Sequence, residues 1–176
     1  MKVLRFLTVL IVGFLFCGQA FAQDEAPKYR FGFSAVGAFP VDDIAGTNRA
    51  GLGMAVQINR QVGKHWTAGM SYYGTKIWGK KDFGNFEIDA YELTTRYYFY
   101  EIGNKYNIYV LLNSGWSFVD EEPDLKQDDL ATAFGGGIEY LVWKNVSLEG
   151  GFMARKSGDK VDSVNPFISL SVPILQ

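Results

Sequence analysis

The sequence predicts an all-β protein: a single eight-stranded antiparallel up-and-down transmembrane β-barrel, preceded by a cleaved signal peptide. Three observations predict this class. The chain begins with an export signal, the segments behind it are about ten residues long and alternate polar with apolar residues, and the polar phase repeatedly contains a charge. A soluble barrel turns its apolar phase inward, whereas strands of membrane-crossing length behind an export signal are expected to turn that phase to lipid and the charges to a polar lumen.

Residues 1–22 have the parts of a signal peptide. Lys2 and Arg5 supply a positive start, an apolar stretch follows, and Ala20-Phe21-Ala22 is a small-x-small cleavage site. An uncleaved membrane anchor is the alternative, but the apolar stretch is too short for a comfortable span. We therefore expect cleavage after Ala22 and a single barrel domain at residues 23–176.

The charge and the cysteine content argue against a nucleic-acid-binding protein and against a lipoprotein. Of the 17 basic residues two lie in the predicted signal, so 15 remain against 19 acidic residues, a formal charge of −4. This balance is not that of a nucleic-acid-binding protein. Cys17 also lies in the signal, so the exported chain is expected to be stable without disulfides. It follows Phe16 rather than the small residue that lipoprotein processing prefers, so lipidation is not expected.

Eight segments show the period-two alternation of β-strands. They are residues 29–39, 50–60, 66–75, 88–100, 106–118, 130–143, 146–155 and 164–174. The expected outward residues of the first four strands are Tyr29, Phe31, Phe33 and Phe39; Leu52, Met54, Val56 and Ile58; Trp66, Ala68, Met70 and Tyr72; and Tyr91, Leu93, Tyr97 and Phe99. Those of the last four are Ile108, Val110, Leu112 and Trp116; Phe134, Ile138, Tyr140 and Val142; Val146, Leu148, Phe152 and Ala154; and Ile168, Leu170, Val172 and Ile174.

The connections alternate in length. Long loops are predicted at residues 40–49, 76–87, 119–129 and 156–163, and short turns at 61–65, 101–104 and 144–145. A transmembrane barrel whose chain starts and ends on one side of the membrane places long loops on the opposite side and short turns on its own. The order of the connections therefore agrees with an even count of eight strands.

Six charges are predicted to face the lumen, and they sum to zero: Arg30, Glu92, Arg96, Glu139, Glu149 and Arg155. The interior of an eight-stranded barrel is only wide enough for side chains to fill it, so unpaired charges there would be costly. We interpret the six as a plug of ion pairs. Glu139 and Glu149 flank one short turn, and we expect them to share an arginine such as Arg155 or Arg30. The alternative is a gate that conducts protons or ions.

Aromatic residues gather at both ends of the predicted strands, as the two interfacial girdles of a transmembrane barrel require. Those predicted at the membrane interface are Trp66, Tyr97, Phe99, Tyr100, Tyr106, Tyr140 and Trp143 beside the short turns and Trp116 near the long loops. A soluble β-sandwich is less compatible with this pattern, because it would bury the six charges or expose the aromatic surface to water.

Together these features, with segments such as Tyr91-Glu92-Leu93-Thr94-Thr95-Arg96-Tyr97-Tyr98-Phe99, resemble the small outer-membrane β-barrel proteins of Gram-negative bacteria, the OmpA-like and OmpX-like group. The resemblance implies an outer-membrane location, contact with outer-membrane lipid and lipopolysaccharide, and insertion by the barrel-assembly machinery. Two features depart from the group. The chain ends on Gln176 rather than on an aromatic residue, and its last strand contains Pro166 and Pro173, each without a ladder donor. We expect Pro166 at the start of that strand and Pro173 at its end.

The function that the resemblance implies is a non-enzymatic scaffold whose surface loops serve envelope integrity, adhesion or host interaction, with an extracellular ligand that the sequence does not name. The first alternative is a narrow channel for ions or small hydrophobic compounds, resembling OmpW-type barrels. The second is a soluble periplasmic lipid-binding barrel.

No cofactor or catalytic group is expected. The one histidine, His65, lies in a short turn, and a Ser/His/acid set would have to recruit Ser71 or Ser147 across the barrel. The third loop is acidic, with Asp120-Glu121-Glu122-Pro123-Asp124 and Asp128-Asp129, but lacks the regular spacing of a dedicated calcium loop. We interpret it, like the first loop with its Asp42-Asp43, as solvated. The lysines of the second loop, Lys76, Lys80 and Lys81, are expected to pair with the third loop.

Overall fold

A computed structural model describes residues 29–41, 45–80, 84–121, 125–143, 146–158 and 161–175, with the backbone alone of residues 121, 125–127 and 175. The predicted signal peptide, residues 1–22, and the first-loop residues Asp42 and Asp43 lie outside the described residues. The described residues contain no helix long and apolar enough to span a membrane.

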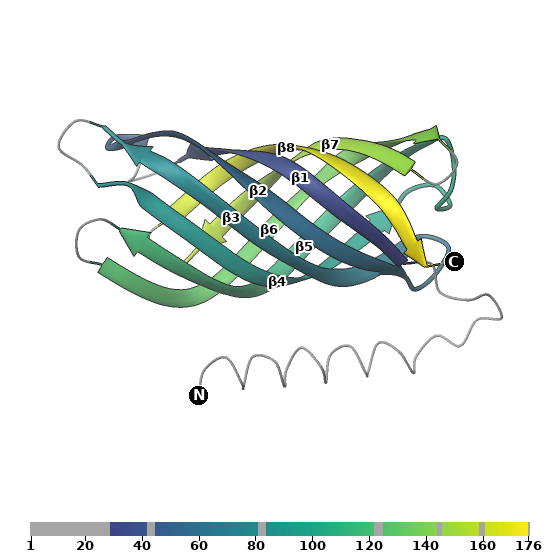
Figure 1. Cartoon of the computed structure of the whole chain (residues 1–176), viewed down its shortest axis with the longest axis horizontal. Coiled ribbons are helices and arrows are strands. Elements are labelled where there is room, and N and C mark those ends of the chain that lie inside the picture. The colour runs from purple at the N-terminus through teal and green to yellow at the C-terminus, as the bar shows by residue number, and fades with distance from the viewer. Residues whose placement is uncertain are drawn as a thin grey trace.

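The described residues form the predicted eight-stranded antiparallel barrel, which Figure 1 shows from the side. The strands are β1 (Tyr29–Pro40), β2 (Asn48–Gln61), β3 (Trp66–Gly79), β4 (Phe86–Tyr98), β5 (Tyr106–Glu121), β6 (Leu125–Trp143), β7 (Val146–Ser157) and β8 (Val161–Leu175). Each strand pairs with the next along the chain, and β8 closes the barrel on β1. We call the end where β1 begins and β8 ends the terminal end, and the opposite end the loop end.

The last strand accommodates its prolines in two ways. Pro166 was predicted at the start of the last strand. It lies instead well inside β8, which begins at Val161. The pairing of β1 with β8 is interrupted beside Pro166, while the pairing with β7 continues. Gly37 of β1 lies against the proline ring, where an added Cβ would be 3.2 Å from the proline Cγ. Pro173 is near the strand end, next to a register shift.

The two phases of the alternation separate as predicted over most of the barrel. Large apolar side chains point outward, and many are half exposed or more, including Phe33, Leu52, Leu112, Phe134, Ile138, Phe152, Ile168 and Leu170. The inward residues of the same strands are buried and mostly polar, among them Gln57, Asn59, Thr94, Asn107, Asn113, Ser147 and Ser169. Because none of the described elements covers the outward face, this apolar belt surrounds the barrel.

Near the loop end the two phases exchange faces. Several inward residues there are apolar and buried: Ile77, Phe86, Ile88, Val119 and Val161, which we call the apolar cap. Asn48 and Ser157 at the same end are polar and also buried. The outward residues there are charged: Lys76, Glu87, Asp89, Asp120, Asp128 and Lys156. This part of the barrel therefore follows the pattern of a soluble barrel, with an apolar inside and a charged outside.

The predicted loops at 76–87 and 119–129 are therefore wrong in extent. β3 continues to Gly79, and β4 begins at Phe86. Likewise β5 continues to Glu121, and β6 begins at Leu125. Polar and apolar residues still alternate here, but the apolar ones face inward. A prediction that requires outward apolar residues therefore places the strand ends too early. The third predicted loop is mostly strand, and Asp120, Asp128 and Asp129 lie in it.

The hairpin of β5 and β6 contains the two longest strands. β6 has 19 residues, whereas a membrane crossing takes about 9–11. Its pairing with β7 begins only at Ala131, opposite Ser157. In the described part of the chain, Leu125–Asp129 thus pair with β5 on one side and with no strand on the other.

Candidate functional site

Three ion pairs cross the lumen, and each joins strands that are not neighbours in the barrel. Arg155 of β7 pairs with Glu92 of β4, Arg96 of β4 with Glu149 of β7, and Arg30 of β1 with Glu139 of β6. Each pair reaches across the barrel rather than along its wall because the lumen is narrow enough for two long side chains to meet. All six charges predicted for the lumen therefore lie there, as three neutral pairs.

The pair nearest the loop end is bidentate. Arg155 donates from both terminal nitrogens to Glu92, at 2.6 and 2.9 Å, and its guanidinium carbon lies 3.8 Å from the centre of the Tyr73 ring. Asn113 donates to the same carboxylate at 3.1 Å, and Ser71 does so at 3.4 Å. Both charged side chains are almost fully buried. The two parallel bonds fix the geometry of the pair as well as neutralising it.

The middle pair is embedded in a second set of polar side chains. Arg96 donates to Glu149 at 2.7 Å and to the side-chain amide oxygen Oε1 of Gln57 at 2.7 Å, and its guanidinium carbon lies 4.8 Å from the Tyr109 ring centre. Tyr109 and Ser171 donate their hydroxyls to Glu149 at 3.1 and 2.6 Å. Five strands contribute to this one network, which ties the walls of the barrel together.

The third pair lies toward the terminal end. Arg30 donates to Glu139 and also to the Ser147 hydroxyl, at 3.3 Å. Glu139 and Glu149 are direct partners across β6 and β7. They were expected to share an arginine, but the structure gives each carboxylate its own, which relieves the repulsion between neighbouring like charges.

Four further inward residues, Gln57, Tyr73, Tyr109 and Asn113, alternate with the outward residues predicted from the sequence, but no role was predicted for them. They contact the charged groups, either through hydrogen bonds or through an aromatic ring face. Their inward position was readable from alternation. Which charge each one meets depends on strands that are far apart in the sequence, so no local signal could have assigned it.

A small cavity lies beside both the Arg155–Glu92 pair and the Arg96–Glu149 pair. Its volume is about 30 Å³, and Gln57, Glu92, Arg96, Asn113 and Arg155 are among its lining residues. This is room for about one or two water molecules. On the loop side of it the apolar cap fills the lumen, with Ile77, Ile88 and Val161 no more than 1% exposed.

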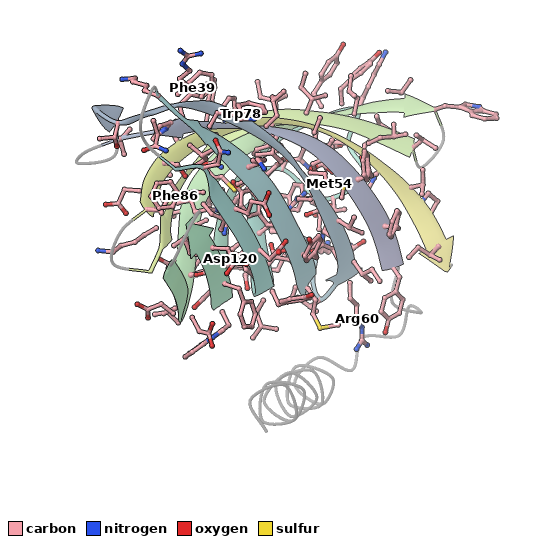
Figure 2. The ribbon with its side chains drawn as sticks, turned by 60° about the vertical axis from the view of Figure 1, so that its left-hand side comes forward. Phe39, Met54, Arg60, Trp78, Phe86 and Asp120 are labelled. Atoms are coloured by element: carbon pink, nitrogen blue, oxygen red, sulfur yellow. The ribbon has the colours of Figure 1, made fainter. Side chains whose placement is uncertain are left out.

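The predicted interfacial aromatics lie on the outside of the barrel. Those beside the short turns are Trp66, Tyr97, Phe99, Tyr100, Tyr106, Tyr140 and Trp143, and Trp116 lies toward the loop end. Two clusters form at the terminal end: Trp66 with Tyr97 and Phe99, and Tyr106 with Tyr140. Phe39 and Trp78 lie toward the loop end, as Figure 2 shows, and are 50% and 40% exposed.

His65 lies apart from Ser71 and Ser147, the serines that a catalytic set would need. His65 shares a hydrogen bond of 3.0 Å with the Tyr98 carbonyl in its short turn. Ser71 donates to Glu92 and Ser147 accepts from Arg30, both in the lumen. Across the described ranges no hydrogen bond joins the histidine to either serine, and no three His, Cys, Asp or Glu side chains gather as a metal site.

The lysines of the second loop have partners other than those expected. Lys76 pairs with Glu87 across its own hairpin, at 2.7 Å. Lys80 donates to the backbone carbonyls of Ala45 and Gly46 in the first loop, both at 3.0 Å. These contacts are with the second hairpin itself and with the first loop, and Lys81 lies outside the described residues.

Comparison with solved structures identifies the architecture. Neisserial surface protein A aligns with 85% of this chain and 100% of its own, at a TM-score of 0.68 and 13% sequence identity. The chain has the fold of the small outer-membrane β-barrels. OprG of Pseudomonas aeruginosa aligns with 89% of the chain and 100% of its own, with a TM-score of 0.59 and 10% identity.

A third similar structure is Ail, the attachment invasion locus protein of Yersinia pestis, in complex with the heparin analogue sucrose octasulfate. It aligns with 84% of this chain and 97% of its own, at a TM-score of 0.53 and 13% identity. No family model matches the chain, and no curated protein sequence matches it significantly. At these identities the likeness is one of fold.

Proposed function

We propose that this chain is a non-enzymatic integral outer-membrane protein of a Gram-negative bacterium, with a closed barrel that displays the hairpins of its loop end outside the cell. The observation that carries the proposal is that an apolar belt surrounds a lumen filled by side chains. In lipid, such a belt is solvated by acyl tails and the barrel leaves no unpaired sheet edge at membrane depth. The fold likeness to outer-membrane proteins supports the same location.

The lumen is blocked by two different means in series. The apolar cap has no groups that could replace the hydration shell of an ion, and a hydrophobic constriction of this kind excludes water and ions. Below it, three crossed ion pairs occupy the remaining width. This arrangement favours a scaffold over a conducting pore.

Conductance across planar bilayers tests this proposal. We expect purified protein to give no steady channel steps, with an open porin in the same bilayer as the positive control. Arg96→Ala should stay closed as well, because it leaves the apolar cap intact. Steady channels in the parent protein would favour the alternative, a narrow channel, for which the cavity between the two ion pairs is the supporting observation.

The displayed surface is formed by the ends of β3 to β6. Its outer face carries Glu87, Asp89, Asp120 and Asp128, with Lys76 paired to Glu87. Among the described strands, Leu125–Asp129 pair with β5 alone. A strand edge that pairs on one side offers backbone donors and acceptors to an extended segment of a partner protein, which suits a role in adhesion or host contact. Ail was solved with a sulfated heparin analogue. The acidic face of this chain favours a basic partner instead, because like charges repel.

A further inference from the structure

The terminal end of the barrel carries basic side chains on its outer face that lie against tyrosines. The Lys105 ammonium is 5.9 Å from the centre of the Tyr106 ring and 5.8 Å from that of Tyr140. On the opposite wall, the Arg60 guanidinium carbon lies 5.8 Å from the centre of the Tyr29 ring. These are distances at which a cation is attracted to an aromatic face.

The fold holds both arrangements in place. Tyr106 and Tyr140 are direct partners across β5 and β6, with ring centres 4.9 Å apart, and Leu141 donates its backbone N–H to the Lys105 carbonyl at 2.9 Å. Tyr29 and Arg60 are likewise direct partners across β1 and β2. Figure 2 shows Arg60 at the end of the barrel away from Phe39 and Trp78.

Neither cation has an acidic partner within the described residues, whereas the neighbouring Lys64 does. Lys64 pairs with Glu101 at 3.2 Å. The structure shows no ion pair for Lys105 or Arg60 in the part of the chain that it describes, and the Arg60 Nε is buried without a hydrogen-bond partner. Two positive charges are therefore fixed beside tyrosine rings at the edge of the apolar belt: Lys105 beside the exposed Tyr106 and the half-buried Tyr140, and Arg60 beside the half-buried Tyr29.

We propose that the Lys105–Tyr106–Tyr140 cluster and the Arg60–Tyr29 pair each bind the phosphate of an anionic phospholipid in the leaflet at the terminal end. The inference rests on the proposed membrane location. An ammonium or guanidinium binds the phosphate, and the tyrosine rings lie at the depth of the headgroups, where amphipathic rings are favoured. The lipid's acyl chains then lie along the apolar belt above.

Native mass spectrometry of the folded protein in detergent micelles tests this. Phosphatidylglycerol and phosphatidylcholine with the same acyl chains are supplied in turn, and the first two bound lipids are counted. We expect the parent protein to prefer phosphatidylglycerol. Lys105→Gln and Arg60→Gln should each weaken its binding at one site roughly fivefold. Lys64→Gln is the matched control and should leave the binding unchanged, since this lysine already has a carboxylate partner.

The same experiment contains the results that overturn the inference. An equal loss in Lys64→Gln would mean that the rim attracts lipid by diffuse charge, and equal binding of both lipids would mean that no site exists. Displacement by inorganic phosphate at the lipid concentration would identify a site for a free anion. Folding is checked separately by the difference in gel migration between unboiled and boiled samples. Its absence would contradict the membrane barrel itself rather than the lipid sites.

Discussion

Single residues in the lumen matter because each is one half of a buried pair. Arg155 and Glu92 have side chains that are 1% and 0% exposed, and their two hydrogen bonds replace the water that both groups lost on folding. The sequence identified the six charges from their phase. It did not identify their partners, since the expected sharing of one arginine by Glu139 and Glu149 is wrong.

Removing one half of this pair should therefore cost more than removing an exposed pair. We expect Glu92→Gln, which keeps the shape but leaves the Arg155 charge buried, to lower the free energy of unfolding by about 3–5 kcal/mol. Urea titration in lipid vesicles, followed by tryptophan fluorescence, measures it. Glu101→Gln, which breaks the exposed pair with Lys64, is the control and should change little. A loss below about 1 kcal/mol for Glu92→Gln would show that the pair contributes no strong constraint.

Within one strand, the environment of the outward face changes along its length. On β4 the outward residues run from Glu87 and Asp89 through Tyr91 and Leu93 to Thr95 and Tyr97. The inward residues run from the apolar Phe86 and Ile88 to the charged Glu92 and Arg96. The point where the two patterns exchange, near Tyr91, marks where the strand leaves the apolar belt.

This boundary can be located by placing the same charge at two depths on β4. We expect Leu93→Arg to destabilise the barrel in vesicles by about 2–4 kcal/mol, because a charge facing the middle of the bilayer is costly. Glu87→Arg should cost far less, since this position already carries a charge and faces water. It also loses the pair with Lys76, an exposed contact worth little. Equal costs at the two positions would contradict the assigned membrane boundary.

The whole molecule is asymmetric along its axis. The terminal end has short turns and an aromatic rim, and the loop end has long hairpins, an acidic outer face and an apolar inside. Figure 1 shows the hairpins of β3–β4 and β5–β6 reaching beyond the ends of the other strands on the side away from the C-terminus. This asymmetry predicts a single orientation in the membrane.

Epitope tags in whole cells test the orientation. A tag inserted between Glu121 and Leu125 should be labelled by antibody on intact cells, because the β5–β6 hairpin is expected outside. A tag inserted after Gly103, in a short turn between β4 and β5, should be labelled only after the outer membrane is opened. The reverse pattern would contradict the proposed topology, and labelling of neither tag in opened cells would show that the chain does not reach the membrane.

The sequence by itself determined the strand count and the face on which the six lumen charges lie, because both follow from local alternation. Only the tertiary structure decided that Arg155 meets Glu92 and Arg96 meets Glu149, and that Ile77, Phe86 and Val119 close the lumen instead of lying in loops. The physical reason is that closing the barrel sets which strands face each other across the lumen. Partners on opposite walls are 53 and 63 residues apart in the chain, where no local pattern relates them.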